Sequence, residues 1–175
     1  MKRFVSLFLF LSFLTLFTSC DTSREVPIDT AAPPPSIDEL VSEPPVLMIE
    51  DGEQTITLRS GNGEWAYHIG NGKWASSNFC GARPLDNVHT PEPVTLSDNP
   101  VTLSFDLLPD SVTVLCWPDT DLGNTESSPS EVPVTNFTFS SKPGSWIYEI
   151  TARWEQSDNR NYHGHASYAF YAVVQ

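Results

Sequence analysis

Residues 146–154 read Trp-Ile-Tyr-Glu-Ile-Thr-Ala-Arg-Trp, and residues 164–170 read Gly-His-Ala-Ser-Tyr-Ala-Phe. In the first stretch an apolar side chain stands at every second position from Trp146 to Trp154. The second stretch does the same from Ala166 through Tyr168 to Phe170. A period of two residues is typical of a β-strand that buries one face. We therefore predict two long strands, joined by the polar turn 157–164.

The same alternation recurs upstream, from Val101 to Leu107. Less regular strand candidates are 46–50, 54–60, 64–69, 73–79, 111–117 and 132–140. No window shows the period of an amphipathic helix. Many short strands separated by Gly, Pro and Asn are typical of a β-sandwich or barrel. We expect residues 46–175 to form one all-β domain, which is long enough to bury its own core.

A short repeat lies inside this domain. Gly-Asn-Gly-Glu-Trp-Ala at 61–66 recurs as Gly-Asn-Gly-Lys-Trp-Ala at 70–75. Asn-Gly is a strong hairpin signal, because both residues accept the positive φ of a type I′ turn. The repeat therefore predicts a three-stranded meander over 54–79. With Asn71-Gly72 as the two-residue loop, Ile69 would face Trp74 and Tyr67 would face Ser76.

Residues 143–154, beginning Pro-Gly-Ser-Trp, and residues 164–170 resemble the last two strands of immunoglobulin-like domains. They are similar to these strands in uncharacterised Gram-positive bacterial lipoproteins with a C-terminal immunoglobulin-like domain. The resemblance implies an immunoglobulin-like antiparallel β-sandwich and supplies no ligand. The chain departs from antibody domains, because no Trp lies between Cys80 and Cys116 and Trp117 follows the second cysteine.

The N-terminus predicts export. A basic start precedes the apolar run 4–17, which as a helix reaches roughly 20 Å and falls short of the ~30 Å hydrocarbon core of a bilayer. These features are typical of a signal peptide over 1–19. The sequence Phe17-Thr18-Ser19-Cys20 resembles a lipobox, which implies a lipid on Cys20 and an extracytoplasmic, membrane-anchored protein. The alternative is an ordinary signal peptide that leaves Cys20 free.

Residues 20–45 are rich in proline and acidic residues and poor in large apolar ones. We expect a disordered linker, because such a segment cannot offset its chain entropy. The full chain has a formal charge of −13, and loss of Lys2 and Arg3 with the signal peptide changes this to −15. So acidic a protein is not expected to bind nucleic acid or an anionic membrane surface.

Two cysteines remain once Cys20 is assigned to lipid. In an exported protein Cys80 and Cys116 are candidates for a disulfide, worth ~3–4 kcal/mol in the loop-entropy model. The alternative is a pair of free thiols.

Metal and catalytic signatures are weak. His163 and His165, with His68 and His89 elsewhere, provide zinc-type ligands, but a polar turn explains His163 without a metal. The loop Asp119–Asn124 is similar to an acidic calcium loop, yet its glycine stands at position five where an EF-hand needs position six. No nucleophile motif or paired-carboxylate motif is present. We expect no enzyme activity and no cofactor.

The aromatic residues carry the sharpest hypothesis about function. The predicted register places Trp65, Tyr67 and Trp74 on one face, where flat rings would form a platform for a glycan or a peptide. The alternative is that these rings belong to the core.

The sequence thus favours a lipid-anchored surface protein with a non-catalytic binding module. Its expected contact surfaces are the loops Asn78–Pro93, Asp119–Glu131 and Ser157–Gly164. Its partner is an unidentified envelope or extracellular protein or glycan. An alternative is an accessory subunit of a membrane transporter or sensor complex, and a third is a metal-binding protein.

Overall fold

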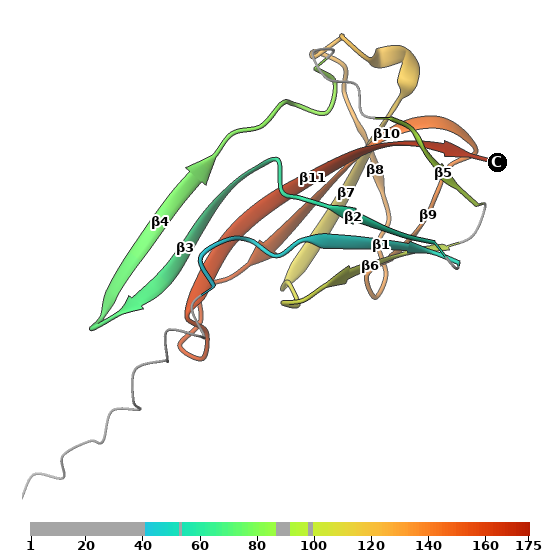
Figure 1. Ribbon diagram of the computed structural model, residues 1–175. Coiled ribbons are helices and arrows are strands. Elements are labelled where there is room, and N and C mark those ends of the chain that lie inside the picture. Colours follow the sequence, from blue (N-terminus) through green and yellow to red (C-terminus); the bar gives the residue numbers. More distant parts are fainter. Residues whose placement is uncertain (1–40, 53, 87–91, 98–99) are drawn as a thin grey trace, which may run out of the picture. The chain divides into compact units, whose positions relative to one another are not determined.

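The computed structural model describes residues 41–52, 54–86, 92–97 and 100–175. These residues form a four-stranded and a seven-stranded sheet (Figure 1). The smaller sheet has the order β2-β1-β6-β9 and consists of β1 (Leu47–Asp51), β2 (Gln54–Leu58), β6 (Pro100–Phe105) and β9 (Thr138–Ser140). The predicted signal peptide, the lipidation site Cys20 and the linker up to residue 40 lie outside the described residues.

The larger sheet has the order β4-β3-β11-β10-β7-β8, and the short strand β5 pairs with β11 in parallel. Its strands are β3 (Asn62–Gly70), β4 (Lys73–Phe79), β5 (Val94–Leu96), β7 (Ser111–Pro118), β8 (Ser130–Val132), β10 (Gly144–Trp154) and β11 (Tyr162–Val174). In the described part of the chain we find no helix with the length and apolar character needed to cross a membrane.

Part of the strand order is compatible with an immunoglobulin-like sandwich. In that fold strands A, B and E share one sheet, and strands C, F and G share the other. Here β1-β6-β9 follow the order A-B-E, and β8-β7-β10-β11 follow the order C′-C-F-G. The β3–β4 hairpin is added beside β11, and Figure 1 shows it extending beyond the smaller sheet. The predicted all-β sandwich is confirmed.

The core lies between the two sheets. Tyr148, Ile150, Ala152 and Trp154 on β10 are all buried, as the alternation predicts, and they pack with the inward residues of β11. The hydroxyl of Tyr148 accepts a hydrogen bond from the backbone N–H of Lys142 at 3.0 Å. A tyrosine corner is formed by a hydrogen bond of this kind. Burial of the Tyr148 side chain raises the pKa of its hydroxyl group.

The residues just before β1 also pack on the domain. The buried hydroxyl of Tyr168 donates to the carbonyl of Pro45 at 2.6 Å, and the indole N–H of Trp65 donates to the carbonyl of Val41 at 3.0 Å. Burial also raises the pKa of Tyr168. By these contacts residues 41–45 belong to the folded domain, although their composition is that of the linker.

The meander prediction is wrong in two respects. β2 pairs with β1 in the smaller sheet, so the chain changes sheets at residues 59–61 and only the β3–β4 hairpin forms. The first Asn-Gly pair is not a turn, because Asn62 begins β3 without a positive φ. Its side chain accepts from the N–H of Gly81 and donates to the carbonyl of Ala82, which secures the chain that leaves β4.

The second Asn-Gly pair forms the predicted tight turn, with φ of 52° at Asn71 and 69° at Gly72. The pairing beside it differs from the prediction. The ladder is shifted between His68 and Gly70, so that Ile69 is a bulge and His68 pairs with Trp74. An extra residue in one strand moves every later side chain to the opposite face. Trp74 therefore lies on the face opposite to Trp65 and Tyr67.

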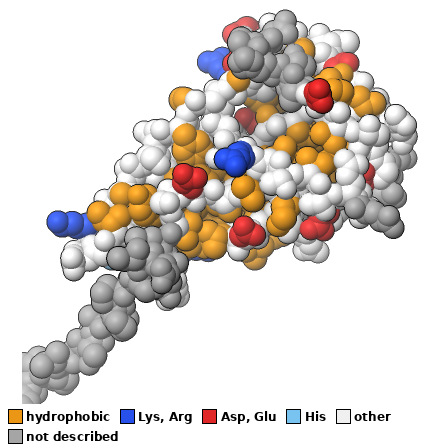
Figure 2. Space-filling view, in the orientation of Figure 1, with side chains coloured by type: hydrophobic (Ala, Val, Ile, Leu, Met, Phe, Trp, Pro, Cys, Tyr) orange, Lys and Arg blue, Asp and Glu red, His pale blue; other side chains and the backbone are white. Residues whose placement is uncertain are grey.

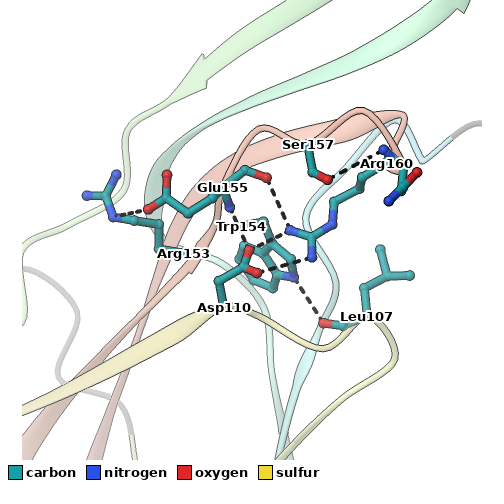
Figure 3. A network of polar contacts seen from close by, with 8 residues as sticks. Leu107, Asp110, Arg153, Trp154, Glu155, Ser157 and Arg160 are labelled. Atoms are coloured by element: carbon teal, nitrogen blue, oxygen red, sulfur yellow. Dashed lines mark hydrogen bonds and ion pairs between the residues drawn. The ribbon is translucent and has the colours of Figure 1, made fainter.

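A polar network joins the β10–β11 turn to the turn before β7 (Figure 3). The guanidinium of Arg160 donates to both carboxylate oxygens of Asp110, at 2.5 and 3.3 Å. The same carboxylate accepts the N–H of Glu155 at 2.7 Å. The Arg160 guanidinium also lies 5.4 Å from the ring centroid of Tyr162.

This network predicts a pH dependence. The hydrogen bond from Arg160, with that from the Glu155 N–H, lowers the pKa of Asp110 below its ordinary value. A lowered pKa stabilises the fold above the unfolded pKa of about 3.9, and the contribution is lost as the pH falls towards the folded pKa. We expect Asp110→Asn to cost about 1 kcal/mol or less at pH 7, because the pair is partly exposed to solvent.

Denaturant unfolding of both proteins between pH 7 and pH 2 checks this. The difference between wild type and Asp110→Asn should shrink as the pH falls below about 4. A difference that grows in acid would contradict the assignment.

Candidate functional site

Trp74 lies beside an open cavity of about 820 Å³. The cavity is lined by His68 and Trp74 of the β3–β4 hairpin, by Val41, by residues 156–161 of the β10–β11 turn and by Tyr162 at the start of β11. The turn is fixed to the hairpin, because the N–H of His68 donates to the carbonyl of Asn161 at 2.8 Å. One of the three predicted contact loops, Ser157–Gly164, thus meets an exposed aromatic side chain.

Two imidazole rings hold the Trp74 indole in place. The ring centroid of His68 lies 5.5 Å from that of Trp74 at an interplanar angle of 77°, and that of His163 lies 5.0 Å away at 56°. His163 belongs to β11, where it pairs with Ala66 of β3. Within the described residues the Nδ1 atom of His163 is buried without a hydrogen-bond partner. Despite these contacts 42% of the Trp74 surface remains exposed.

The predicted aromatic platform is therefore divided between two faces. Trp65 is fully buried, stacks on Tyr162 with centroids 5.4 Å apart, and meets Trp154 edge-on at 5.2 Å. Tyr67 is half-buried and packs against the same core. For Trp65 and Tyr67 the core interpretation is correct, and Trp74 alone of the three stands at the surface beside a cavity. The bulge at Ile69 is the reason that Trp74 lies on the opposite face from Trp65 and Tyr67.

The other two predicted contact loops meet on the outer face of the larger sheet. The N–H of Gly123 donates to the carbonyl of Leu85 at 2.8 Å, which joins the loop after β4 to the loop after β7. Leu85 packs with Trp117 and Ile147 in a second small core. These loops thus cover apolar residues of the larger sheet. On the face of the molecule that Figure 2 shows, hydrophobic side chains lie in separate areas with charged side chains between them.

Two smaller cavities lie beneath this cover, of about 300 and 230 Å³. Arg83 and Pro84 line both of them. Glu149 lines the smaller one, and its burial raises the pKa of the carboxyl, while a hydrogen bond with Ser167 lowers it. Residues 87–91, which include His89, lie outside the described part of this loop.

The acidic loop after β7 is bound to the protein itself. Residues Asp119–Asp121 form a single 3-10 turn. The carboxylate of Asp119 accepts a hydrogen bond from the Tyr171 hydroxyl at 3.2 Å, and that of Asp121 accepts one from the Ser127 hydroxyl at 2.5 Å. Across the described ranges, no three His, Cys, Asp or Glu side chains converge in a way that could hold a metal ion.

The disulfide prediction is wrong, because both cysteines are free. Cys116 lies on β7, opposite Tyr148 of β10, and its side chain is buried in the inter-sheet core. Cys80 follows β4 and is exposed. In antibody domains the bridge links strands B and F, but the corresponding strands β6 and β10 contain no cysteine. An even number of cysteines does not place two of them at facing positions.

Thiol labelling checks this assignment. In the native protein we expect a maleimide to modify Cys80 rapidly, because it is exposed, and to leave the buried Cys116 unmodified. Unfolding in denaturant without a reductant should make Cys116 reactive. Peptide mapping identifies the modified residue, and a need for prior reduction at both positions would reinstate the disulfide.

Neither the contact of His163 with Trp74 nor the place of the β10–β11 turn beside the cavity is predicted by the sequence. The sequence indicates His163 only as a candidate metal ligand, and the turn only as one of three contact loops. No local pattern in the sequence signals this contact, because Trp74 and His163 become neighbours only when β3 pairs with both β4 and β11.

Comparisons of this chain with models of protein families, with curated proteins and with solved structures found no match.

Proposed function

We propose that this chain is a lipid-anchored, extracytoplasmic binding module without catalytic activity, and that the Trp74 cavity is its contact site. The N-terminal sequence supports the anchor. For the binding role the observation that carries the proposal is the exposed indole of Trp74, which two imidazoles hold at the rim of a cavity.

Trp74 is more exposed than the other tryptophans that the structure describes. Trp65, Trp117 and Trp154 are buried. Trp146 is half-buried, and its indole N–H donates a hydrogen bond to the carbonyl of Pro143. An exposed aromatic ring beside a cavity offers a ligand a large flat contact area at a small entropic cost. Tryptophan is among the residues that most often dominate the free energy of binding. A rigid strand also presents it at little entropic cost.

A binding experiment with the full chain tests the proposal. The protein, purified in detergent, is mixed with a sedimentable cell-envelope fraction, and the bound share is measured against protein concentration. We expect Trp74→Ala to weaken binding at least tenfold, as for a central aromatic contact. Its cost in stability should be about 1 kcal/mol or less, because the side chain is partly exposed.

Ile69→Ala is the matched control. Ile69 is 49% exposed on the same hairpin but does not line the cavity. It should bind as the wild type does. If Trp74→Ala binds as tightly as the wild type, the cavity is not the contact site and the proposal fails.

A further inference from the structure

We infer that the ligand of the Trp74 cavity is a neutral carbohydrate, with a pyranose ring stacked on the Trp74 indole and its hydroxyls bound by the β10–β11 turn. The inference rests on the proposed binding function and names the chemical class that this site takes.

The orientation of the Trp74 indole favours a stacked ligand. Its contacts with His68 and His163 are edge-on or tilted, at 77° and 56°, and neither imidazole lies parallel to the indole in a stack. The indole therefore retains exposed surface for a ligand. A pyranose ring presents C–H groups on one face, and these are drawn to the negative face of an aromatic ring. Its hydroxyl groups point outward from the ring edge, towards whatever surrounds the indole.

The side chains of the β10–β11 turn favour a ligand rich in hydroxyl groups. Gln156, Asp158 and Asn159 line the cavity, and across the described residues no hydrogen bond or ion pair uses their side chains. Each of the two amides has both donors and an acceptor, which matches a hydroxyl group that donates and accepts. Residues of this type beside an exposed tryptophan provide a stacking surface and several hydrogen bonds to hydroxyls at once.

The charges around the cavity disfavour an anionic ligand. Arg160 also lines the cavity, but its guanidinium is engaged by both oxygens of Asp110 and by the carbonyl of Glu155. A phosphate or carboxylate ligand would need an unpaired cation, and the described lining has no other Arg or Lys. Among the described lining residues, Asp158 is the charged side chain without a hydrogen bond or ion pair, and its carboxylate repels anions. These features favour a neutral ligand.

The size of the cavity is that of a small-ligand site. A volume of about 820 Å³ lies within the ~300–1,000 Å³ range of small-ligand sites. The cavity is open to solvent, as suits part of a long polymer more than an enclosed small molecule. A short stretch of a polysaccharide, with one sugar on the indole and its neighbours along the turn, fits both features.

The test treats the same envelope fraction in two ways before the full chain is added. Periodate cleaves vicinal diols and destroys sugar rings, whereas a protease removes protein. We expect periodate to reduce wild-type binding at least tenfold and protease to leave it within twofold. Chitotriose, cellotriose and maltotriose, added at millimolar concentration to the untreated fraction, serve as defined competitors, and at least one should displace the protein.

Two variants refine the result. Trp74→Phe keeps an aromatic face and should bind within about threefold of the wild type. Gln156→Ala combined with Asn159→Ala removes the exposed amides without touching the core, and should weaken binding at least fivefold at an unchanged melting temperature.

The outcomes separate this inference from the proposed function. Loss of binding after protease but not after periodate would assign a protein or peptide ligand, overturning the carbohydrate while the binding function stands. A Trp74→Ala variant that binds as the wild type does would overturn both. Sensitivity to periodate together with sensitivity to Trp74→Ala supports both.

Discussion

Replacing Trp65 by alanine is expected to lower the free energy of unfolding by about 3–5 kcal/mol, the range for a large aromatic residue in a core. Trp65 is fully buried and contacts Tyr162 in a stack and Trp154 edge-on. Its indole N–H also donates to the carbonyl of Val41, so truncation leaves this acceptor without its partner. Denaturant unfolding, followed by far-UV circular dichroism, measures the loss.

Trp65→Phe and Trp74→Ala are the matched variants. Trp65→Phe keeps an apolar ring and removes the N–H, so it should cost less than Trp65→Ala. Trp74→Ala removes the same side chain from the opposite face and should cost about 1 kcal/mol or less. If the two alanine variants exchanged these costs, the bulge at Ile69 and the hairpin register would be wrong.

Replacing Gly164 by alanine is expected to cost about 3 kcal/mol or more. Gly164 pairs with Trp65 on one side and with Trp154 on the other, so the two indoles meet above it. A Cβ here would lie 2.1 Å from the carbonyl oxygen of Glu64, and the φ of +146° is unfavourable for a side chain. The clash is with backbone, so relief requires β3 and β11 to separate, and strain adds to overpacking.

Gly72→Ala separates the two causes. Gly72 has a φ of +69°, and a Cβ there would meet nothing within 4 Å. Gly72→Ala should therefore lose only roughly 1 kcal/mol of stability, from the unfavourable backbone conformation alone. Thermal unfolding of both variants gives the comparison. A Gly164→Ala protein as stable as Gly72→Ala would show that the close approach of β3 to β11 is not required.

Strands with a strict period of two residues are well predicted from sequence. On β10 the alternating residues Tyr148, Ile150, Ala152 and Trp154 are all buried, because such a strand has one face on the core whatever its neighbours are. The short strand β5 was missed, since three residues without a pattern carry no periodic signal. Within the predicted strand 132–140 the structure has only the last residue of β8 (Ser130–Val132) and the whole of β9 (Thr138–Ser140), which lie in different sheets.

The candidate site was less predictable. Trp74 was identified as a binding residue, but for a face that it does not share with Trp65 and Tyr67. Turn chemistry specified Asn71-Gly72 correctly, yet nothing in the local sequence reveals that Ile69 is extra in the ladder. A bulge depends on how β3 fits both of its neighbours, so it is decided by pairing across the sheet.

The sequence by itself determined the all-β class, the long β10–β11 hairpin and the tight turn at Asn71-Gly72, because these depend on near neighbours along the chain. It also determined the expectation of an exported, lipid-anchored protein. The tertiary structure alone decided the separation of Cys80 from Cys116, the faces of Trp65 and Trp74, and the meeting of Trp74 with His163. Each of these depends on which distant strands lie side by side, and a period of two residues specifies faces within a strand but not its partners.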